Sequence, residues 1–481
     1  MIRFLALGSY VYQSATAIAL IFAISHILPP EGYTAFSLAL ASSQLLCVLM
    51  FEWLQLAGVR FLSPARGDDV TRIRSSLFTA ASLSTIALLL VGGTVAHFGK
   101  LPIPVIALGL ALAVLQGWTD LHLMVIRVSG RLGTAALLLA IRASLLLIGA
   151  SAGALLYRNA EATLAGLLTG YGFGFLLSSL SDRALLQWKL RRTTRVDLID
   201  FCRYGMLAAA ASVIHLSVPV ALRFIVVGRL NGSSFGPAAS AGFSLALDLL
   251  QRPFTVLVSA IHTVNYPDVV VKFDHGSSQD AKQATARLFE FIICSTAIML
   301  GGLIGFMPDA GRIFVPGDIL TSFLAAAPAA AAFYFLHLQL QSTVAIIPHL
   351  RKVALRLVII AALQLLAVSA ISAFAIAAGA SPPGVIAGAA LATAVIVLLA
   401  SGPTIRFGAF PRISLVATTV IGALLIGSLC AIPSEPWIWL IGKIAVAAAI
   451  VVLIAWQGDF LMVSRRASHR EGTHLDVAGL S

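Results

Sequence analysis

The chain has 481 residues, of which 59% are hydrophobic and only 11% are charged, and its formal net charge is +12. A soluble domain usually carries about 25% charged residues, so this composition excludes an ordinary water-soluble fold. In a soluble protein such a positive charge would suggest nucleic acid. Here the cations are better explained as topology signals facing anionic lipid headgroups, and no nucleic acid is expected as a partner.

Apolar segments long enough to cross a bilayer follow one another along the whole chain. A helix of about 20 apolar residues spans a hydrocarbon core of ~30 Å, and lipid offers no partner to an unpaired backbone group. We therefore predict an all-α polytopic membrane protein with about 14 transmembrane helices. In chain order the predicted spans are Phe4–Leu28, Thr34–Gly58, Ser76–Val95, Ile103–Ile126, Leu132–Leu156, Ala162–Ser181, Tyr204–Val227, Ala238–Val264, Phe289–Phe306, Ile319–Ile346, Val353–Ala378, Gly384–Ser401, Ile413–Ala431 and Trp437–Trp456.

The Lys and Arg residues alternate between the gaps that separate these spans. Of the 32 cations, 24 fall in every second gap, 4 fall in the other gaps and 4 lie inside spans. Cationic loops remain in the cytoplasm, so the pattern predicts a bacterial inner-membrane protein with cytoplasmic N- and C-termini. Membrane lipids are its expected surroundings, and Trp437 and Trp439 suit an interfacial belt at the outer end of the last span.

The most basic loop, at 187–203, separates two halves of six spans each. The sequence Phe-Ser-Leu-Ala-Leu occurs at 36–40 and again at 243–247, at a similar depth in the second and eighth spans. We predict a parallel pseudo-repeat, as in transporters that rock one half against the other. The predicted domains are an N-terminal six-helix bundle at 1–186, a basic cytoplasmic linker at 187–203, a C-terminal six-helix bundle at 204–405, two additional transmembrane helices at 406–460 and a cytoplasmic tail at 461–481.

Ionisable side chains inside the spans are the best candidates for a functional site, because each costs about 2.5–3.5 kcal/mol to insert. They include Arg142, Arg223, Asp248 and Arg252. Asp248 and Arg252 are four residues apart, so they share a helix face and can pair. Lys443 lies near the outer end of the last span, where its amine can reach the interface.

Several segments resemble those of one transporter family. They are Leu28-Pro29-Pro30-Glu31-Gly32-Tyr33 with the following Phe36-Ser37-Leu38-Ala39, the basic loop between the sixth and seventh spans, and Asn265-Tyr266-Pro267. In these the chain resembles the polysaccharide flippases (O-antigen and exopolysaccharide, Wzx-type) of the multidrug/oligosaccharidyl-lipid/polysaccharide exporter superfamily, which is MATE-like. The resemblance implies two six-helix bundles in a V around a central cavity. It also implies movement of a polyprenyl-pyrophosphate-linked oligosaccharide to the periplasmic leaflet, with polysaccharide polymerase or export machinery as possible partners.

A pyrophosphate cargo gives the arginines inside the spans a function. The planar donors of Arg suit phosphate oxygens, so Arg142, Arg223 and Arg252, with Asp248 nearby, are expected to form a cationic cavity. Gln13, beside Ser14 and Thr16, could offer hydrogen bonds to sugar hydroxyls. The alternative interpretation is structural: Arg252 only neutralises Asp248, Arg223 reaches the outer surface, and Arg142 finds a carbonyl.

Other functions remain open at this stage. A MATE-like cation or drug antiporter would need acidic residues in its cavity, whereas the mid-membrane charges here are three Arg and one Asp. A membrane-embedded polysaccharide polymerase or ligase would need a large outward loop. A proton-pumping respiratory subunit, which also has about fourteen spans, would need Lys and Glu residues buried in its mid-membrane helices. No enzyme activity, catalytic residue, metal or cofactor is expected. No His, Asp and Glu cluster has the spacing of metal ligands, and the nucleotide-binding pattern GxxxxGK[ST] does not occur. The energy source is left open.

Overall fold

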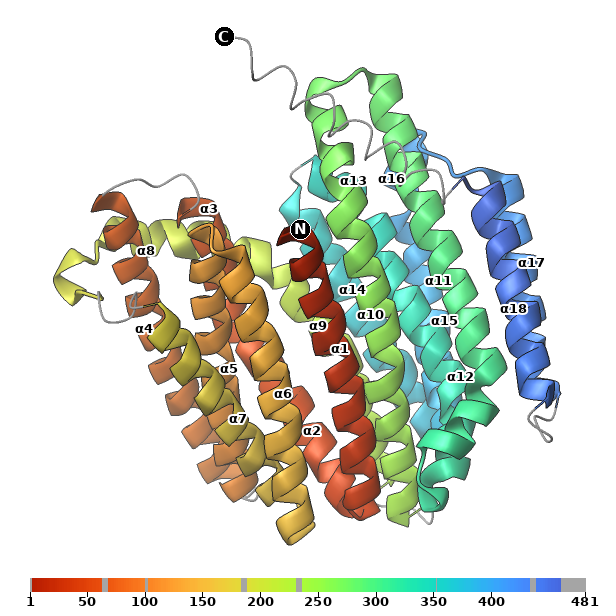
Figure 1. The fold of residues 1–481 in the computed structure, drawn as a ribbon, viewed down its shortest axis with the longest axis horizontal. Coiled ribbons are helices and arrows are strands. Elements are labelled where there is room, and N and C mark those ends of the chain that lie inside the picture. Colours follow the sequence, from red (N-terminus) through yellow and green to blue (C-terminus); the bar gives the residue numbers. More distant parts are fainter. Residues whose placement is uncertain are drawn as a thin grey trace. The chain divides into compact units, whose positions relative to one another are not determined.

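The computed structural model describes residues 2–62, 68–99, 103–182, 188–230, 236–351, 353–432 and 438–459, and every regular element in these ranges is a helix (Figure 1). In chain order the α-helices are α1 (Ile2–Ile27), α2 (Pro30–Cys47), α3 (Trp53–Leu62), α4 (Asp68–Gly99), α5 (Ile103–Val128), α6 (Leu132–Tyr157), α7 (Ala160–Ser181), α8 (Arg195–Phe201), α9 (Leu207–Leu230), α10 (Gly236–His275), α11 (Ser278–Phe314), α12 (Gly317–Gln339), α13 (Ile346–Leu350), α14 (Ala354–Ala377), α15 (Pro382–Ala400), α16 (Gly402–Phe407), α17 (Ile413–Ser428) and α18 (Ile438–Gln457). Short π or 3₁₀ turns are η1 (Val48–Glu52), η2 (Leu190–Arg192), η3 (Cys202–Met206), η4 (Leu340–Val344) and η5 (Leu429–Ala431).

The helices confirm the predicted membrane class. Thirteen predicted spans coincide with helices that are long and apolar enough to cross a membrane, and the first coincides with α1, whose described apolar part is Val11–Ile27. Large apolar side chains cover the outer faces of these helices; Leu90, Leu156, Leu399 and Ile413 are 67–82% exposed. Such surfaces are stable in lipid, so the chain is a multi-pass membrane protein. Trp437 and the predicted tail at 461–481 lie outside the described residues.

Two helices extend well beyond their predicted spans. α10 continues to His275 and α11 begins at Ser278, although the apolar segments end at Val264 and begin at Phe289. Hydropathy locates only the lipid-embedded part of a helix, whereas intrahelical hydrogen bonds continue into polar sequence. The predicted spans are therefore correct in place but too short here.

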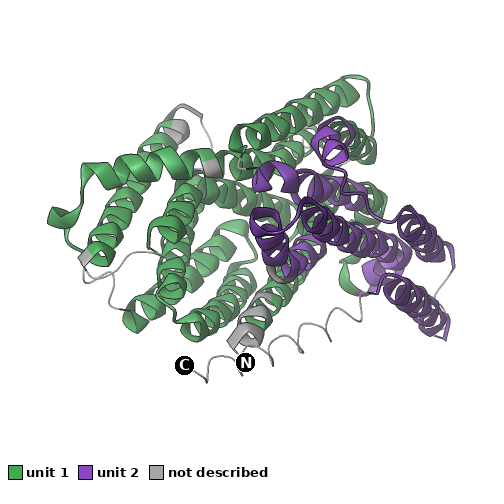
Figure 2. Ribbon diagram, turned by 90° about the horizontal axis from the view of Figure 1, so that it is seen from above, with its two compact units in different colours: residues 1–252, 314–330, 352–396 green, residues 253–313, 331–351, 397–481 purple. Residues whose placement is uncertain are grey.

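The chain forms two compact units, which Figure 2 shows in green and purple. Unit 1 comprises residues 1–252, 314–330 and 352–396, and unit 2 comprises residues 253–313, 331–351 and 397–481. The continuous helices α10 and α12 contribute to both. The division into two six-helix bundles around a linker stays a prediction.

Unit 1 contains an unusually close helix pair, α6 and α7. Gly149 and Gly153 of α6 face α7, and Gly166 and Gly170 of α7 face α6. A Cβ atom added at Gly166 would lie 2.0 Å from the backbone oxygen of Gly149, so no larger residue fits. Small residues let membrane helices pack by direct backbone contact. This contact fixes the position of the α6 and α7 side chains discussed below.

The described part of the basic segment at 187–203 packs against α4 within unit 1. The carboxylate of Asp197 accepts hydrogen bonds from Arg72 and from the Ser76 hydroxyl, the latter at 2.9 Å. The ring of Phe201 lies 5.4 Å from that of Phe61 on α3. The segment is thus a folded, docked element containing α8, and its role as a linker stays a prediction.

In unit 2, α17 and α18 are joined to α11 by ion pairs. Glu290 of α11 binds the guanidinium of Arg412 at 3.0 Å, and Asp309 near the other end of α11 binds the amine of Lys443 at 2.9 Å. Lys443 is only 3% exposed, so the expectation that its amine reaches the interface is wrong. A buried carboxylate partner makes burial of the ammonium tolerable, and sequence spacing could not reveal a partner 134 residues away.

Candidate functional site

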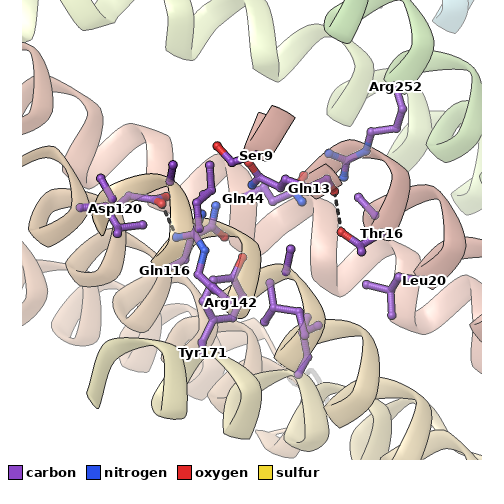
Figure 3. Close-up of a pocket in the computed structure, with 18 of the residues that line it drawn as sticks. Ser9, Gln13, Thr16, Leu20, Gln44, Gln116, Asp120, Arg142, Tyr171 and Arg252 are labelled. Carbon is purple, nitrogen blue, oxygen red and sulfur yellow. Dashed lines mark hydrogen bonds and ion pairs between the residues drawn. The ribbon is translucent and has the colours of Figure 1, made fainter. Parts of the chain in front are cut away.

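A cavity of about 370 Å³ lies among the helices of unit 1 (Figure 3). Its walls come from α1, α2, α3, α5, α6, α7 and α10. The volume falls within the range of roughly 300–1,000 Å³ typical of ligand sites. Its polar lining residues are Ser9, Gln13, Thr16, Gln44, Gln55, Gln116, Asp120, Arg127, Arg142, Tyr171 and Arg252, and the rest of the lining is Ala, Leu and Ile.

The charged side chains of the lining give the cavity an excess of positive charge. Arg127, Arg142 and Arg252 contribute three positive charges and Asp120 contributes one negative charge, which leaves +2. Low-dielectric walls focus the field of such charges and raise the local concentration of oppositely charged ligands. The electrostatics of the cavity therefore favour an anion.

Arg142 is held in a fixed position by three helices. Its Nη1 donates to Oδ1 of Asp120 on α5 at 2.5 Å, and its guanidinium lies 5.8 Å from the ring centre of Tyr171 on α7. A Cβ atom at Gly174 would lie 3.1 Å from the Cγ atom of Arg142, so glycine leaves room for the arginine stem. The Arg142 side chain is 6% exposed and that of Asp120 is 25% exposed. The carboxylate is thus the more accessible partner of a neutral pair.

Arg252 is the cation that the protein leaves available to a ligand. Figure 3 shows it reaching toward Gln13 from α10, on the side of the cavity away from the Arg142–Asp120 pair. The side chain is partly exposed, and none of the ion pairs among the described residues includes it. Its donors therefore face the cavity without a carboxylate partner.

Arg223 and Asp248 form a separate, closed network in unit 1. Nη2 of Arg223 lies 2.7 Å from Oδ1 of Asp248, while the hydroxyls of Tyr33 and Ser37 donate to Oδ2 at 3.0 and 2.6 Å. Arg223 is 4% exposed and also donates to the backbone oxygen of Ser37 at 3.2 Å. The network joins α2, α9 and α10, and neither Arg223 nor Asp248 belongs to the cavity lining within the described chain.

This arrangement corrects two sequence-based interpretations. Asp248 is neutralised by Arg223 and not by Arg252, and Arg223 does not reach the outer surface. Helical spacing shows only that Asp248 and Arg252 share a face; it does not show that another helix supplies a closer cation. Of the five candidates, Gln13, Arg142 and Arg252 lie together in the cavity lining, and their part in binding a substrate stays a prediction.

Several polar residues of the cavity were not candidates from sequence, among them Gln44, Gln55, Gln116 and Asp120. Asp120 lies near the inner end of its predicted span, where solvation at the membrane interface accounts for a carboxylate as well as a functional site does. The glutamines carry no charge, so a search for ionisable residues passes over them. Amides inside apolar spans are a usable signal, since an uncompensated amide is also costly in lipid.

Comparison with known proteins identifies the fold. No protein-family model matches the chain, and no curated protein matches it. Solved structures do match. The lipid II flippase MurJ in an inward closed conformation superposes with a TM-score of 0.72 at 15% identity, covering 96% of this chain and 99% of that chain. The chain has the fold of the MurJ flippase.

Two transporters of the MOP superfamily share this MurJ-like fold. An inward-facing multidrug resistance transporter of the MATE family matches with a TM-score of 0.63 at 14% identity, over 82% of this chain and 94% of that chain. A transporter from Pyrococcus furiosus Vc1, whose binding pocket is described as reversed in polarity, matches with a TM-score of 0.59 at 14% identity. The match covers 85% of this chain and 98% of that chain. The all-helical, MATE-like fold predicted from sequence is therefore confirmed. The matching proteins are transporters and flippases.

Proposed function

We propose that this chain moves a polyprenyl-pyrophosphate-linked oligosaccharide from the cytoplasmic to the periplasmic leaflet of a bacterial inner membrane. The transported lipid would serve surface or exopolysaccharide biosynthesis, and polymerase or export machinery would receive it. Transport would proceed by alternating access around the cavity of unit 1. The MurJ-like fold supports this proposal, because the matching protein is a flippase of a lipid.

One observation carries the proposal: Arg252 faces the cavity unpaired while Arg142 is neutralised by Asp120. A pyrophosphate bears several negative charges and planar arrays of acceptor oxygens. The guanidinium group donates two parallel hydrogen bonds to such oxygens, which makes Arg better suited to this ligand than a point charge. The apolar remainder of the lining, which includes Leu20, Leu146 and Leu167, suits the start of a polyprenyl chain.

The proposed orientation of the chain in the membrane rests on the distribution of Lys and Arg residues. Twenty-four of the 32 Lys and Arg residues lie on the side of the membrane that carries both chain ends, and cationic loops remain cytoplasmic. We therefore place both termini in the cytoplasm. The Arg223–Asp248 network contacts Tyr33 and Ser37 in the first two turns of α2.

The second candidate is a MATE-like antiporter of cations or drugs. Asp120 is the feature that favours it, because a cavity carboxylate can bind a cation and because MATE transporters share the fold. Against it, Asp120 is already bound to Arg142, and the cavity retains a formal charge of +2. A polymerase or ligase is the weakest candidate, since the neighbours in fold are transporters.

A ligand-stabilisation experiment separates the two leading candidates. Purified full-length protein is heated with a short polyprenyl diphosphate or with a lipophilic organic cation, and the Tm is measured. A ligand that binds only the native state at 100 times its Kd stabilises by about 2.7 kcal/mol. We expect the diphosphate to raise the Tm and the cation to leave it unchanged. The reverse result would support the antiporter.

A further inference from the structure

The cavity of unit 1 contains four side-chain amides that the protein does not use for its own hydrogen bonding. They come from four helices and belong to Gln13 of α1, Gln44 of α2, Gln55 of α3 and Gln116 of α5. All four residues are partly exposed, and no hydrogen bond among the described residues involves one of their amide groups. An amide in a membrane-embedded bundle is costly without a partner, so these groups bind water or a ligand.

The amides lie between two sites of different charge. Figure 3 shows Gln44 and Gln116 near the Arg142–Asp120 pair, and Gln13 next to Arg252. Because Arg142 neutralises Asp120, the wall from that pair to Gln13 is polar without net charge. Of the two lining cations outside that pair, Arg252 lies beside Gln13, and Arg127 lies two turns beyond Asp120 on α5. A ligand that fits this wall would therefore carry an anionic group at one end and neutral hydrogen-bonding groups beside it.

We infer that the amides bind an uncharged, hydroxyl-rich sugar next to the diphosphate, and that Arg252 binds the diphosphate itself. This inference rests on the proposed function and adds the class of sugar. A side-chain amide both donates and accepts, as a hydroxyl does, so it pairs with a sugar hydroxyl in either direction. The partly exposed carboxylate of Asp120 is a further acceptor. An acidic sugar would meet that carboxylate and gain no cation from the amides.

A neutral and an acidic sugar would make different contacts with the amides and with Asp120. A neutral hexose replaces the water on the amides with its hydroxyls. A hexuronic acid places a second carboxylate near Asp120, where like charges repel and the adjacent guanidinium of Arg142 is already bound. The cavity should therefore prefer a neutral sugar to an acidic one at the position attached to the diphosphate.

The test compares three probes on the full-length protein in detergent: a short polyprenyl diphosphate, the same lipid carrying a neutral hexose disaccharide, and the same lipid carrying a hexuronic acid. We expect the neutral glycolipid to bind most tightly. The double variant Gln44→Leu/Gln116→Leu should bind it about tenfold more weakly, since each lost hydrogen bond contributes a factor of a few. The variant should bind the sugar-free diphosphate as before. Gln283→Leu changes an exposed glutamine of α11 and serves as the matched control.

A second variant keeps the side-chain volume in case leucine disturbs packing. Gln44→Glu should weaken binding of the neutral glycolipid less than the double variant does. It should weaken binding of the hexuronic acid form more than the double variant does. The sugar assignment would be overturned if both variants lost the same affinity for all three probes, or if neither variant lost affinity for any probe. Either result would leave the transport proposal standing. If the unsubstituted protein binds the sugar-free diphosphate but not more tightly with a neutral sugar, the sugar assignment also fails. Failure to bind any probe would overturn the proposed function itself.

Discussion

Two buried arginine–aspartate pairs in unit 1 differ in how completely the protein satisfies them. The Arg223–Asp248 pair receives two further donors, the hydroxyls of Tyr33 and Ser37, and both of its members are largely buried. The Arg142–Asp120 pair has a partly exposed carboxylate and lies in a cavity. The Asp248 carboxylate is bound through both of its oxygens, whereas the Asp120 carboxylate is bound to Arg142 through Oδ1 and is 25% exposed to the cavity.

One helix takes part in both regions. α10 supplies Asp248 to the closed network and, one turn later, supplies Arg252 to the cavity. Removing a member of the closed network leaves a buried charge without a partner, whereas removing Arg252 takes away only a group that faces the cavity. The two regions should therefore respond differently to the same kind of substitution, with stability lost in one and transport lost in the other.

The largest effect is expected from Asp248→Ala. The guanidinium of Arg223, which is 4% exposed, would lose its carboxylate, and breaking a buried pair in this way costs about 3–5 kcal/mol. We expect a large fall in Tm and in the amount of protein found in the membrane, measured by size-exclusion chromatography after heating. The double variant Arg223→Met/Asp248→Leu should recover most of that stability, because it buries no charge. Normal stability of the single variant would mean that the network is not closed.

The next effect is expected from Arg252→Ala, which should impair transport and not folding. A hydrogen bond to a charged group contributes about 1.5–3 kcal/mol, so loss of Arg252 should reduce export at least tenfold. Cells that lack the native gene would be complemented with the variant, and surface polysaccharide and membrane protein would both be measured. Arg356→Ala, at an exposed arginine of α14, is the control and should export normally. Normal export by Arg252→Ala would exclude the cation from the mechanism.

A smaller effect is expected from Gly174→Ala on α7. The added Cβ would lie 3.1 Å from Arg142 Cγ, which is closer than ordinary contact, so the guanidinium should shift relative to Asp120. Transport rate should fall a few-fold. Gly172→Ala on the same helix is a matched control, because a Cβ there meets nothing within 4 Å. If both variants transport equally well, the position of Arg142 is not important for transport.

The smallest effect is expected from Asp120→Asn. This variant should gain affinity for the ligand, whereas the three variants above lose stability or transport. Asparagine keeps an acceptor oxygen for Arg142 but raises the formal charge of the cavity lining from +2 to +3. Affinity for a short polyprenyl diphosphate should rise about threefold at low salt and less at high salt, because salt screens the added attraction. Weaker binding of the diphosphate at every salt concentration would show that Asp120 contributes to ligand binding as an acceptor.

Membrane class and span order could be predicted because each depends on local sequence. Apolar length and alternating cations place the fourteen spans, and the segments that resemble polysaccharide flippases lead to the fold that the MurJ comparison confirms. Helix ends were less accurate at α10 and α11, because polar sequence outside the lipid can remain helical. Lipid-embedded length is a property of composition, whereas helix length also depends on hydrogen bonding and packing.

The pairing of charges could not be predicted, because it depends on contacts between helices far apart in sequence. Arg223 lies 25 residues from Asp248 along the chain, yet sequence reasoning paired Asp248 with Arg252, which is only four residues away. The same limit hid Asp309 as the partner of Lys443. Of the five residues predicted to form one site, Gln13, Arg142 and Arg252 line one cavity and their part in binding stays a prediction, whereas the amides of Gln44, Gln55 and Gln116 needed the structure.

A translocation assay in proteoliposomes tests the central claim most directly. The protein is reconstituted with a fluorescent polyprenyl-pyrophosphate-linked oligosaccharide, and transfer between leaflets is followed by quenching from outside. We predict rapid transfer with the unsubstituted protein and with Arg356→Ala, and transfer at the protein-free rate with Arg142→Ala/Arg252→Ala inserted to the same level. Transfer by the double variant at the unsubstituted rate would contradict a cationic cavity as the site of transport.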